Sequence, residues 1–146
     1  MKVDDGNLQI EFFDKTRQKN RGMAACLINL EDTIRMAEWI PYHYTTSPLG
    51  SLVIALDPKN SERGISRTME IIDLWKDKIE ITLWPDFFLP KEKIFMERQS
   101  YTRHRQVYFA NQCLAYHKEQ NRTWTLLTDN DEYFTFNYVH DDESLD

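Results

Sequence analysis

The strongest structural signal in the sequence is the alternation of aromatic and polar residues at positions 133–139. On an extended chain, Phe134 and Phe136 point to one side while their neighbours point to the other, which is typical of a half-buried strand. A turn-rich triplet at 129–131 separates this segment from a second stretch of β-forming residues, 123–128. We therefore predict a C-terminal β-hairpin with one face packed against the core.

The spacing of apolar residues predicts two helices. Apolar side chains recur every three or four residues over positions 23–37, and Pro41 then stops this helix. The same spacing appears at residues 65–75, where Ser61 or Ser66 would cap the first turn. Each helix would place its apolar residues on one face.

Three shorter segments predict strands. Residues 52–56 form an unbroken aliphatic run, and residues 8–12 and 79–83 alternate in character. Residues 42–50 are polar and turn-rich, so we expect a connection there. Residues 107–116 fit either a helix or a strand, and we favour a strand because a polar turn follows and leads into the next β-rich stretch.

These elements predict an α+β fold. We expect a single domain over residues 1–139, with a mainly antiparallel sheet whose C-terminal meander or hairpin packs against two or three helices. The 146 residues of the chain are enough for one substantial hydrophobic core. Residues 140–146 follow as an acidic segment, and we expect a mobile tail there.

Charge is distributed unevenly along the chain. The formal net charge is −6, and the residues after Arg122 contain no Lys or Arg. Residues 91–105, in contrast, hold five basic and two acidic side chains. A dense field of one sign attracts oppositely charged molecules, so the acidic C-terminal part favours a cationic partner. Its seven acidic residues are Asp129, Asp131, Glu132, Asp141, Asp142, Glu143 and Asp146.

The residues that could carry chemistry lie far apart and form no complete motif. Cys26 and Cys113 lack the spacing of a disulfide framework or a zinc site, so we expect two reduced thiols in the core. The histidines have no paired metal-ligand spacing, and we expect solvated surface side chains. We therefore predict a protein that is not an enzyme and that has no metal site or cofactor. The four histidines are His43, His104, His117 and His140.

A small, acidic, aromatic-rich α+β chain without catalytic motifs resembles the bacterial immunity proteins that neutralise toxins, including those of contact-dependent growth inhibition systems. The resemblance rests on the acidic and aromatic positions near the C-terminus. It implies a non-catalytic protein that occupies the basic cleft of a toxin and reaches it quickly through steering by opposite charges. The partner-binding residues that we predict are Asp129, Asp131, Glu132, Tyr133, Asp141, Asp142 and Glu143.

The basic segment 91–105 supports an alternative function. Its arginines could hold phosphates while Tyr101 stacks on a base, as in a nucleic-acid-binding or processing accessory protein. We favour the toxin-binding function because an overall acidic chain repels nucleic acid outside one patch, and because the basic groups also offset the protein's own acidic surface.

Two features of the sequence bear on location. Residues 1–6 contain neither the basic region nor the apolar run of a signal peptide. The longest aliphatic run, 52–56, is far shorter than the ~20 residues that span a bilayer. We therefore expect a cytoplasmic protein with no membrane partner.

Overall fold

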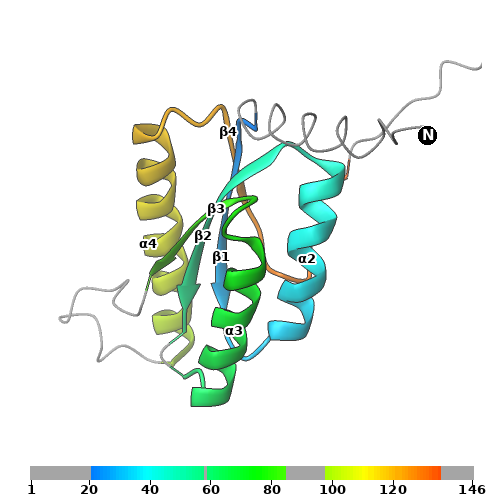
Figure 1. Ribbon diagram of the computed structural model, residues 1–146. Coiled ribbons are helices and arrows are strands. Elements are labelled where there is room, and N and C mark those ends of the chain that lie inside the picture. The colour runs from blue at the N-terminus through cyan, green and yellow to red at the C-terminus, as the bar shows by residue number, and fades with distance from the viewer. Residues whose placement is uncertain (1–20, 58, 85–97, 136–146) are drawn as a thin grey trace, which may run out of the picture.

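Strands and helices alternate along the chain in the computed structural model, which describes residues 21–57, 59–84 and 98–135 (Figure 1). Long helical connections between strands are the pattern of a parallel sheet. None of the described helices is long and apolar enough to cross a membrane. In chain order the elements are β1 (Met23–Asn29), α2 (Thr33–Thr46), β2 (Leu49–Leu56), α3 (Glu62–Trp75), β3 (Glu80–Trp84), α4 (Arg98–Glu119) and β4 (Trp124–Leu127).

The described strands form one four-stranded parallel sheet in the order β3-β2-β1-β4. β1 pairs along its length with β2, from Met23 opposite Leu49 to Asn29 opposite Leu56, and β4 pairs with the other side of β1. The fold is therefore α/β, and the predicted α+β fold with a mainly antiparallel sheet is wrong. Residues 124–127, the first strand of the predicted hairpin, instead pair in parallel with β1, and residues 128–135 form no strand. The rest of the predicted second strand, 136–139, lies outside the described residues.

Helices cover both faces of the sheet, α2 and α3 on one face and α4 on the other (Figure 1). The chain moves outward from β1 through β2 to β3, and then returns past β1 to place β4 on the opposite side. Crossovers between parallel strands are right-handed almost without exception, so a reversal of direction moves the connecting helix to the other face. The result is a doubly wound sheet.

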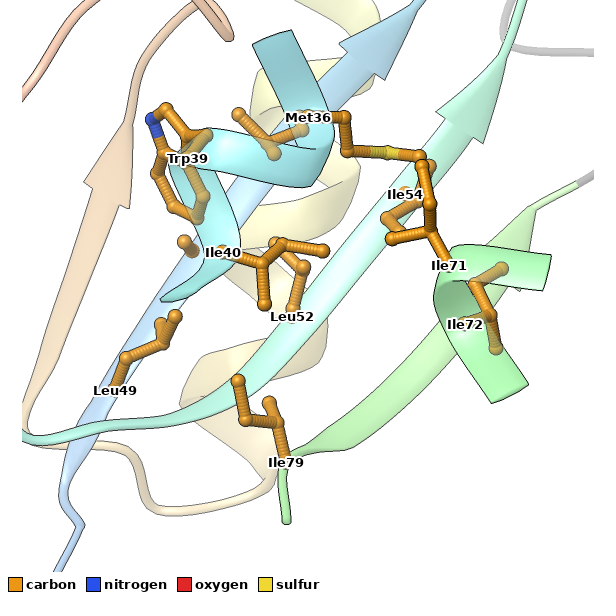
Figure 2. Packing of buried hydrophobic residues seen from close by; sticks show 11 residues of the cluster. Met36, Trp39, Ile40, Leu49, Leu52, Ile54, Ile71, Ile72 and Ile79 are labelled. Carbon is orange, nitrogen blue, oxygen red and sulfur yellow. The ribbon is translucent and has the colours of Figure 1, made fainter. Parts of the chain in front are cut away.

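The two faces of the central strands bury different clusters. Leu27 and Leu52 pack under α2 and α3, whereas their neighbours Cys26 and Val53 pack under α4. Burial on both faces explains why β1 and β2 are almost entirely apolar. The cluster under α2 and α3 contains Ala25, Leu27, Met36, Trp39, Ile40, Leu49, Leu52, Ile54, Ile71, Ile72 and Ile79 (Figure 2).

The predicted helix at residues 23–37 is wrong. Its first part is the strand β1, and α2 begins only at Thr33. A strand buried on both faces carries apolar side chains at nearly every position, and these include the three-and-four spacing of a helix. The prediction that Pro41 ends the helix also fails, since α2 continues to Thr46 with Pro41 inside it.

The connection expected at residues 42–50 is largely regular structure. Its first half is the last turn of α2, and its end belongs to β2. Hydroxyl groups of the helix end bond back to carbonyls one turn earlier: Thr45 donates to the Pro41 carbonyl at 2.7 Å and Ser47 to the His43 carbonyl at 2.6 Å. The polar side chains that indicated a loop therefore satisfy the carbonyls at a helix C-terminus.

Residues 107–116 belong to the long helix α4, so the strand that we favoured there is wrong. Phe109, Cys113 and His117 are buried at intervals of four residues, which places them on the helix face that covers the sheet. The polar turn after this segment ends a helix and not a strand. Turn residues mark the end of either element, which is why they did not decide between them.

Three predicted elements are confirmed. The aliphatic run lies in β2, the alternating segment before residue 85 overlaps β3, and the second helix is α3. Ser61 is the N-cap of α3, because its hydroxyl accepts a hydrogen bond from the Gly64 N–H at 3.1 Å. The predicted strand at 8–12 and the predicted tail at 140–146 lie outside the described residues.

Gly50 lies where β2 passes close to the backbone of Arg21. A Cβ atom at Gly50 would overlap the Arg21 carbonyl oxygen and lie 2.6 Å from the Arg21 Cβ atom, which is far too close for non-bonded atoms. We expect Gly50→Ala to lower the free energy of unfolding by about 1–3 kcal/mol, the usual cost of forcing volume into a packed site. Denaturant titration measures the loss. Gly22→Ala is the control, since its Cβ would meet only the Thr123 side chain, at 3.0 Å, and equal losses would contradict the steric explanation.

Candidate functional site

The direction of winding reverses between β1 and β4. The connections on the β2 side of β1 cross one face of the sheet, and the connection that leads into β4 crosses the other. Doubly wound proteins bind ligands at such a reversal, in the crevice outside the carboxyl ends of the strands. We call the carboxyl ends of β1 and β4 the switch point.

A pocket of about 230 Å³ opens at the switch point, between α4 and the ends of β1 and β4. Apolar side chains form most of its wall, and the segment after β4 adds polar groups that include the carboxylates of Asp129 and Glu132. An apolar wall with an anionic rim suits a ligand that has an aliphatic stem and a cationic head. The residues that line this switch-point pocket are Cys26, Ile28, Gln106, Phe109, Ala110, Leu127, Thr128, Asp129 and Glu132.

Five carboxylates lie in the loops that follow β1 and β4, and we call them the acidic edge. They are Glu31, Asp32, Asp129, Asp131 and Glu132. Asp32 and Asp131 each lie 3.3 Å from Nη1 of Arg35, which joins the two loops. The side-chain amide of Asn130 donates to the Asp32 carbonyl at 3.3 Å and strengthens the same connection.

The carboxylates of the turn after β4 crowd one another. Partial burial raises the pKa of Asp129, and the negative charges of Glu132 and Asp131 raise it further. The Glu132 carboxylate accepts hydrogen bonds from the Asp129 backbone N–H and the Thr128 hydroxyl, both at 3.1 Å, which holds it beside Asp129. A cation bound at this turn would relieve the repulsion.

The other two carboxylates occupy helix N-termini. The Glu31 carboxylate accepts hydrogen bonds from the backbone N–H and the hydroxyl of Ser61 at the start of α3, and these bonds lower its pKa. Its backbone has a left-handed φ of 58°, and its N–H donates to the side chain of Asn60. Asp32 caps α2 by accepting from the Arg35 N–H at 3.4 Å. Helix N-termini bind phosphate in doubly wound proteins, so these carboxylates would repel a nucleotide.

The segment after β4 lies along α2. The indole N–H of Trp39 donates to the Glu132 carbonyl at 2.9 Å, and the backbone N–H of Phe134 donates to Nε2 of His43 at 3.0 Å. The Tyr133 ring stacks against His43, with centroids 5.8 Å apart. Because Trp39 and His43 are fully buried, these contacts anchor the acidic edge to the core.

The structure brings some of the predicted partner-binding residues together and adds others. The three acidic residues of the turn at 129–132 lie at the switch point, and Tyr133 follows them with 40% of its surface exposed. Asp32 joins them through Arg35 and Asn130, whereas the carboxylate of its neighbour Glu31 lies at the start of α3. The sequence did not indicate these two residues, since nothing local marks them. The predicted residues Asp141, Asp142 and Glu143 lie outside the described residues.

The basic segment that supported a nucleic-acid site is partly used in packing. Nη1 of Arg105 lies 2.6 Å from the Asp57 carboxylate, and both side chains are nearly buried. Arg105 is therefore not available to a phosphate group. Arg103 and His104 are exposed on α4, and residues 91–97 lie outside the described part of the chain.

Two cysteines and a histidine meet between β1 and α4, and one of them, Cys26, also lines the pocket. The sulfur atoms of Cys26 and Cys113 form a disulfide, so the prediction of two reduced thiols is wrong. His117, one turn after Cys113, is fully buried, and so is His43, so the prediction of solvated histidines is wrong for both. The spacing of four residues between Cys113 and His117 is a local signal that both side chains lie on one helix face.

Comparison with protein-family models, with curated proteins and with solved structures finds no match to this chain. The fold and the site therefore define its class, a doubly wound α/β protein with an acidic switch point. What it binds must be inferred from the chemistry of that site.

Proposed function

We propose that this protein is a non-catalytic binding protein whose acidic edge engages a cationic protein partner. The observation that carries the proposal is the presence of five carboxylates at the switch point, the place where a doubly wound sheet binds ligands. An anionic ligand would be repelled there. A basic protein would be steered toward the edge and held in register by complementary charge.

The switch-point pocket would receive one Lys or Arg side chain of the partner. Its volume of about 230 Å³ and its apolar wall, with Phe109 and Leu127, fit an aliphatic stem. Asp129 and Glu132 would pair with the charged head at the rim. A side chain buried in a central pocket commonly carries a large share of the binding energy of an interface, so this contact would be the anchor.

A bacterial toxin domain with a basic cleft is the partner that this chemistry fits best. Many such toxins act on nucleic acid, so an acidic edge would occupy the position of the phosphate groups. The proposal places the protein in the cytoplasm of the cell that it protects. Reducing conditions there would open the disulfide between Cys26 and Cys113 that the structure contains.

Neutralising three carboxylates of the acidic edge should slow association with a basic toxin domain encoded in the neighbouring reading frame. The changes are Asp129→Asn, Asp131→Asn and Glu132→Gln, made together. We expect the association rate at low ionic strength to fall by about tenfold or more, because electrostatic steering is lost, and the difference to shrink as salt rises. Surface plasmon resonance over a salt series measures both effects.

A matched control changes the net charge equally at the far end of the molecule. Glu70→Gln, Asp73→Asn and Asp77→Asn remove three exposed carboxylates on and after α3, away from the switch point. This variant should associate at the wild-type rate. If the two triple variants slow association equally, the acidic edge is not the contact site. A neighbouring frame whose product does not bind the protein would count against the toxin as partner.

A further inference from the structure

Three side chains with metal-binding chemistry converge between β1 and α4. Cys113 and His117 stand one turn apart on α4, and Cys26 faces them from β1. A ligand atom of each side chain lies within 4.8 Å of the others. All three residues are buried, with at most 2% of their surface exposed. Two thiolates and an imidazole are a ligand set that binds zinc in proteins.

The hydrogen bonding of His117 leaves one ring nitrogen available. Nε2 lies 3.2 Å from the carbonyl oxygen of Ala25, and because a carbonyl only accepts, Nε2 carries the proton. Nδ1 then holds a lone pair, and it is buried with no hydrogen-bond partner among the described residues. Burial lowers the pKa of His117, in agreement with a neutral ring. Zinc-binding histidines show the same arrangement, in which one nitrogen donates to a backbone carbonyl and the other ligates the metal.

We propose that, once the disulfide between them is reduced, Cys26 and Cys113 bind one Zn²⁺ ion together with His117. A dithiol reductant supplies the two electrons: its own thiols become a disulfide, while the Cys26–Cys113 bond becomes two thiols. Zinc then displaces the two thiol protons to solvent and forms two Zn–S bonds and one Zn–N bond. The oxidised chain has no thiolate to offer, so zinc binding depends on the redox state. This proposal is independent of the cationic partner.

The surroundings of the cluster accommodate a tetrahedral metal. Zn–S bonds of about 2.3 Å and a Zn–N bond of about 2.0–2.1 Å place the ligand atoms roughly 3.5–4 Å apart. The three ligand atoms already lie within 4.8 Å of one another, so they can reach these distances once the two sulfur atoms separate. Cys26 also lines the switch-point pocket, which gives its side chain room to move. The fourth position of the metal would face this pocket, open to water or to a ligand.

Titration of the full chain with Co²⁺ tests the proposal, because Co²⁺ bound by thiolate shows a strong sulfur-to-cobalt charge-transfer absorption. We expect the reduced protein to bind one Co²⁺ with this absorption and to lose it when Zn²⁺ is added. The oxidised protein should show no such band. His117→Gln should weaken binding by at least the roughly 10–100-fold loss that follows a change in a metal's outer ligand sphere. His104→Gln, an exposed position on the same helix, should bind like wild type.

Several results would overturn the proposal. They are a reduced chain that is folded by circular dichroism yet lacks the thiolate band, equal binding by the oxidised chain, and unchanged affinity in His117→Gln. If His117→Gln does not fold, the reduced and oxidised wild-type chains decide the question without it. A reduced chain that is itself unfolded also counts against the proposal, because the site requires the folded arrangement of β1 and α4.

Discussion

Replacing Asp57 with Ala will lower the free energy of unfolding by about 3–5 kcal/mol. The Asp57 carboxylate lies 2.6 Å from Nη1 of Arg105, and the two side chains are only 11% and 7% exposed. Without Asp57, the guanidinium loses this counter-charge and yet stays charged in a site nearly free of water, because arginine does not lose its proton in proteins. Denaturant unfolding followed by circular dichroism measures the loss.

Two further variants separate the loss of pairing from other effects. Asp57→Leu combined with Arg105→Met removes both charges, and we expect it to recover most of the stability, since apolar residues of similar volume can replace a buried ion pair. Asp73→Ala breaks an exposed pair with Lys76, whose atoms lie 2.8 Å apart, and should leave the unfolding transition where it is. If Asp57→Ala changes the free energy of unfolding no more than Asp73→Ala does, the buried pair does not hold the end of β2 to α4.

Elements with local signals could be predicted from the sequence. α3 contains its cap, Ser61, and its apolar residues within one short stretch, and β2 is an aliphatic run bounded by turn residues. In both cases the residues that specify the element are neighbours in the chain. A single sequence therefore carries the whole signal.

The arrangement of the sheet could not be predicted in the same way. Residues 124–127 have the composition of a strand whether their neighbour is parallel or antiparallel, and their partner, β1, lies near the other end of the described chain. β1 does not show the alternation of apolar and polar residues that identifies a strand, because neighbouring strands flank it on both sides and helices cover both its faces. Tertiary contacts, and not the local sequence pattern, therefore determine the partner of β4 and the strand conformation of β1.

The candidate site shows the same division between local and distant information. Charge counting found the acidic turn at 129–132, because its carboxylates are close in sequence. Glu31 and Asp32 became part of the acidic edge only through the pairing of β1 with β4. The cluster between β1 and α4 was missed because 87 residues separate Cys26 from Cys113. The parallel topology thus adds the loop after β1 to the acidic turn at 129–132, and the two together form the acidic edge.

His43 connects the acidic edge to the core through a hydrogen-bond pattern that requires a neutral ring. Its Nδ1 lies 2.9 Å from the Trp39 carbonyl and donates to it, and its Nε2 accepts from the Phe134 N–H at 3.0 Å. A second proton on Nε2 would face the Phe134 N–H and break this bond. Burial accordingly lowers the pKa of His43.

Lowering the pH from about 7.5 to about 5.5 will therefore destabilise the protein. Below the ordinary histidine pKa of 6.5, the unfolded chain binds a proton at His43 that the folded chain does not bind. The free energy of unfolding then falls by about 1.4 kcal/mol per pH unit for each such histidine, until the lowered pKa of the folded state is reached. His117, whose pKa is also lowered by burial, adds to the slope. Asp129 acts in the opposite sense, because its pKa is raised on folding.

Two histidine variants show which histidine causes the dependence of stability on pH. Both are made in an Asp129→Asn background, which removes the opposing titration of Asp129. His104→Gln changes an exposed residue and should keep the dependence of stability on pH, whereas His43→Gln should lose about half of it. An unchanged slope in His43→Gln would contradict the neutral, buried state of His43. The same protonation also breaks the bond to the Phe134 N–H, which anchors the segment that carries the acidic edge. Partner binding in the Asp129-containing protein should therefore weaken over the same pH range, ahead of global unfolding.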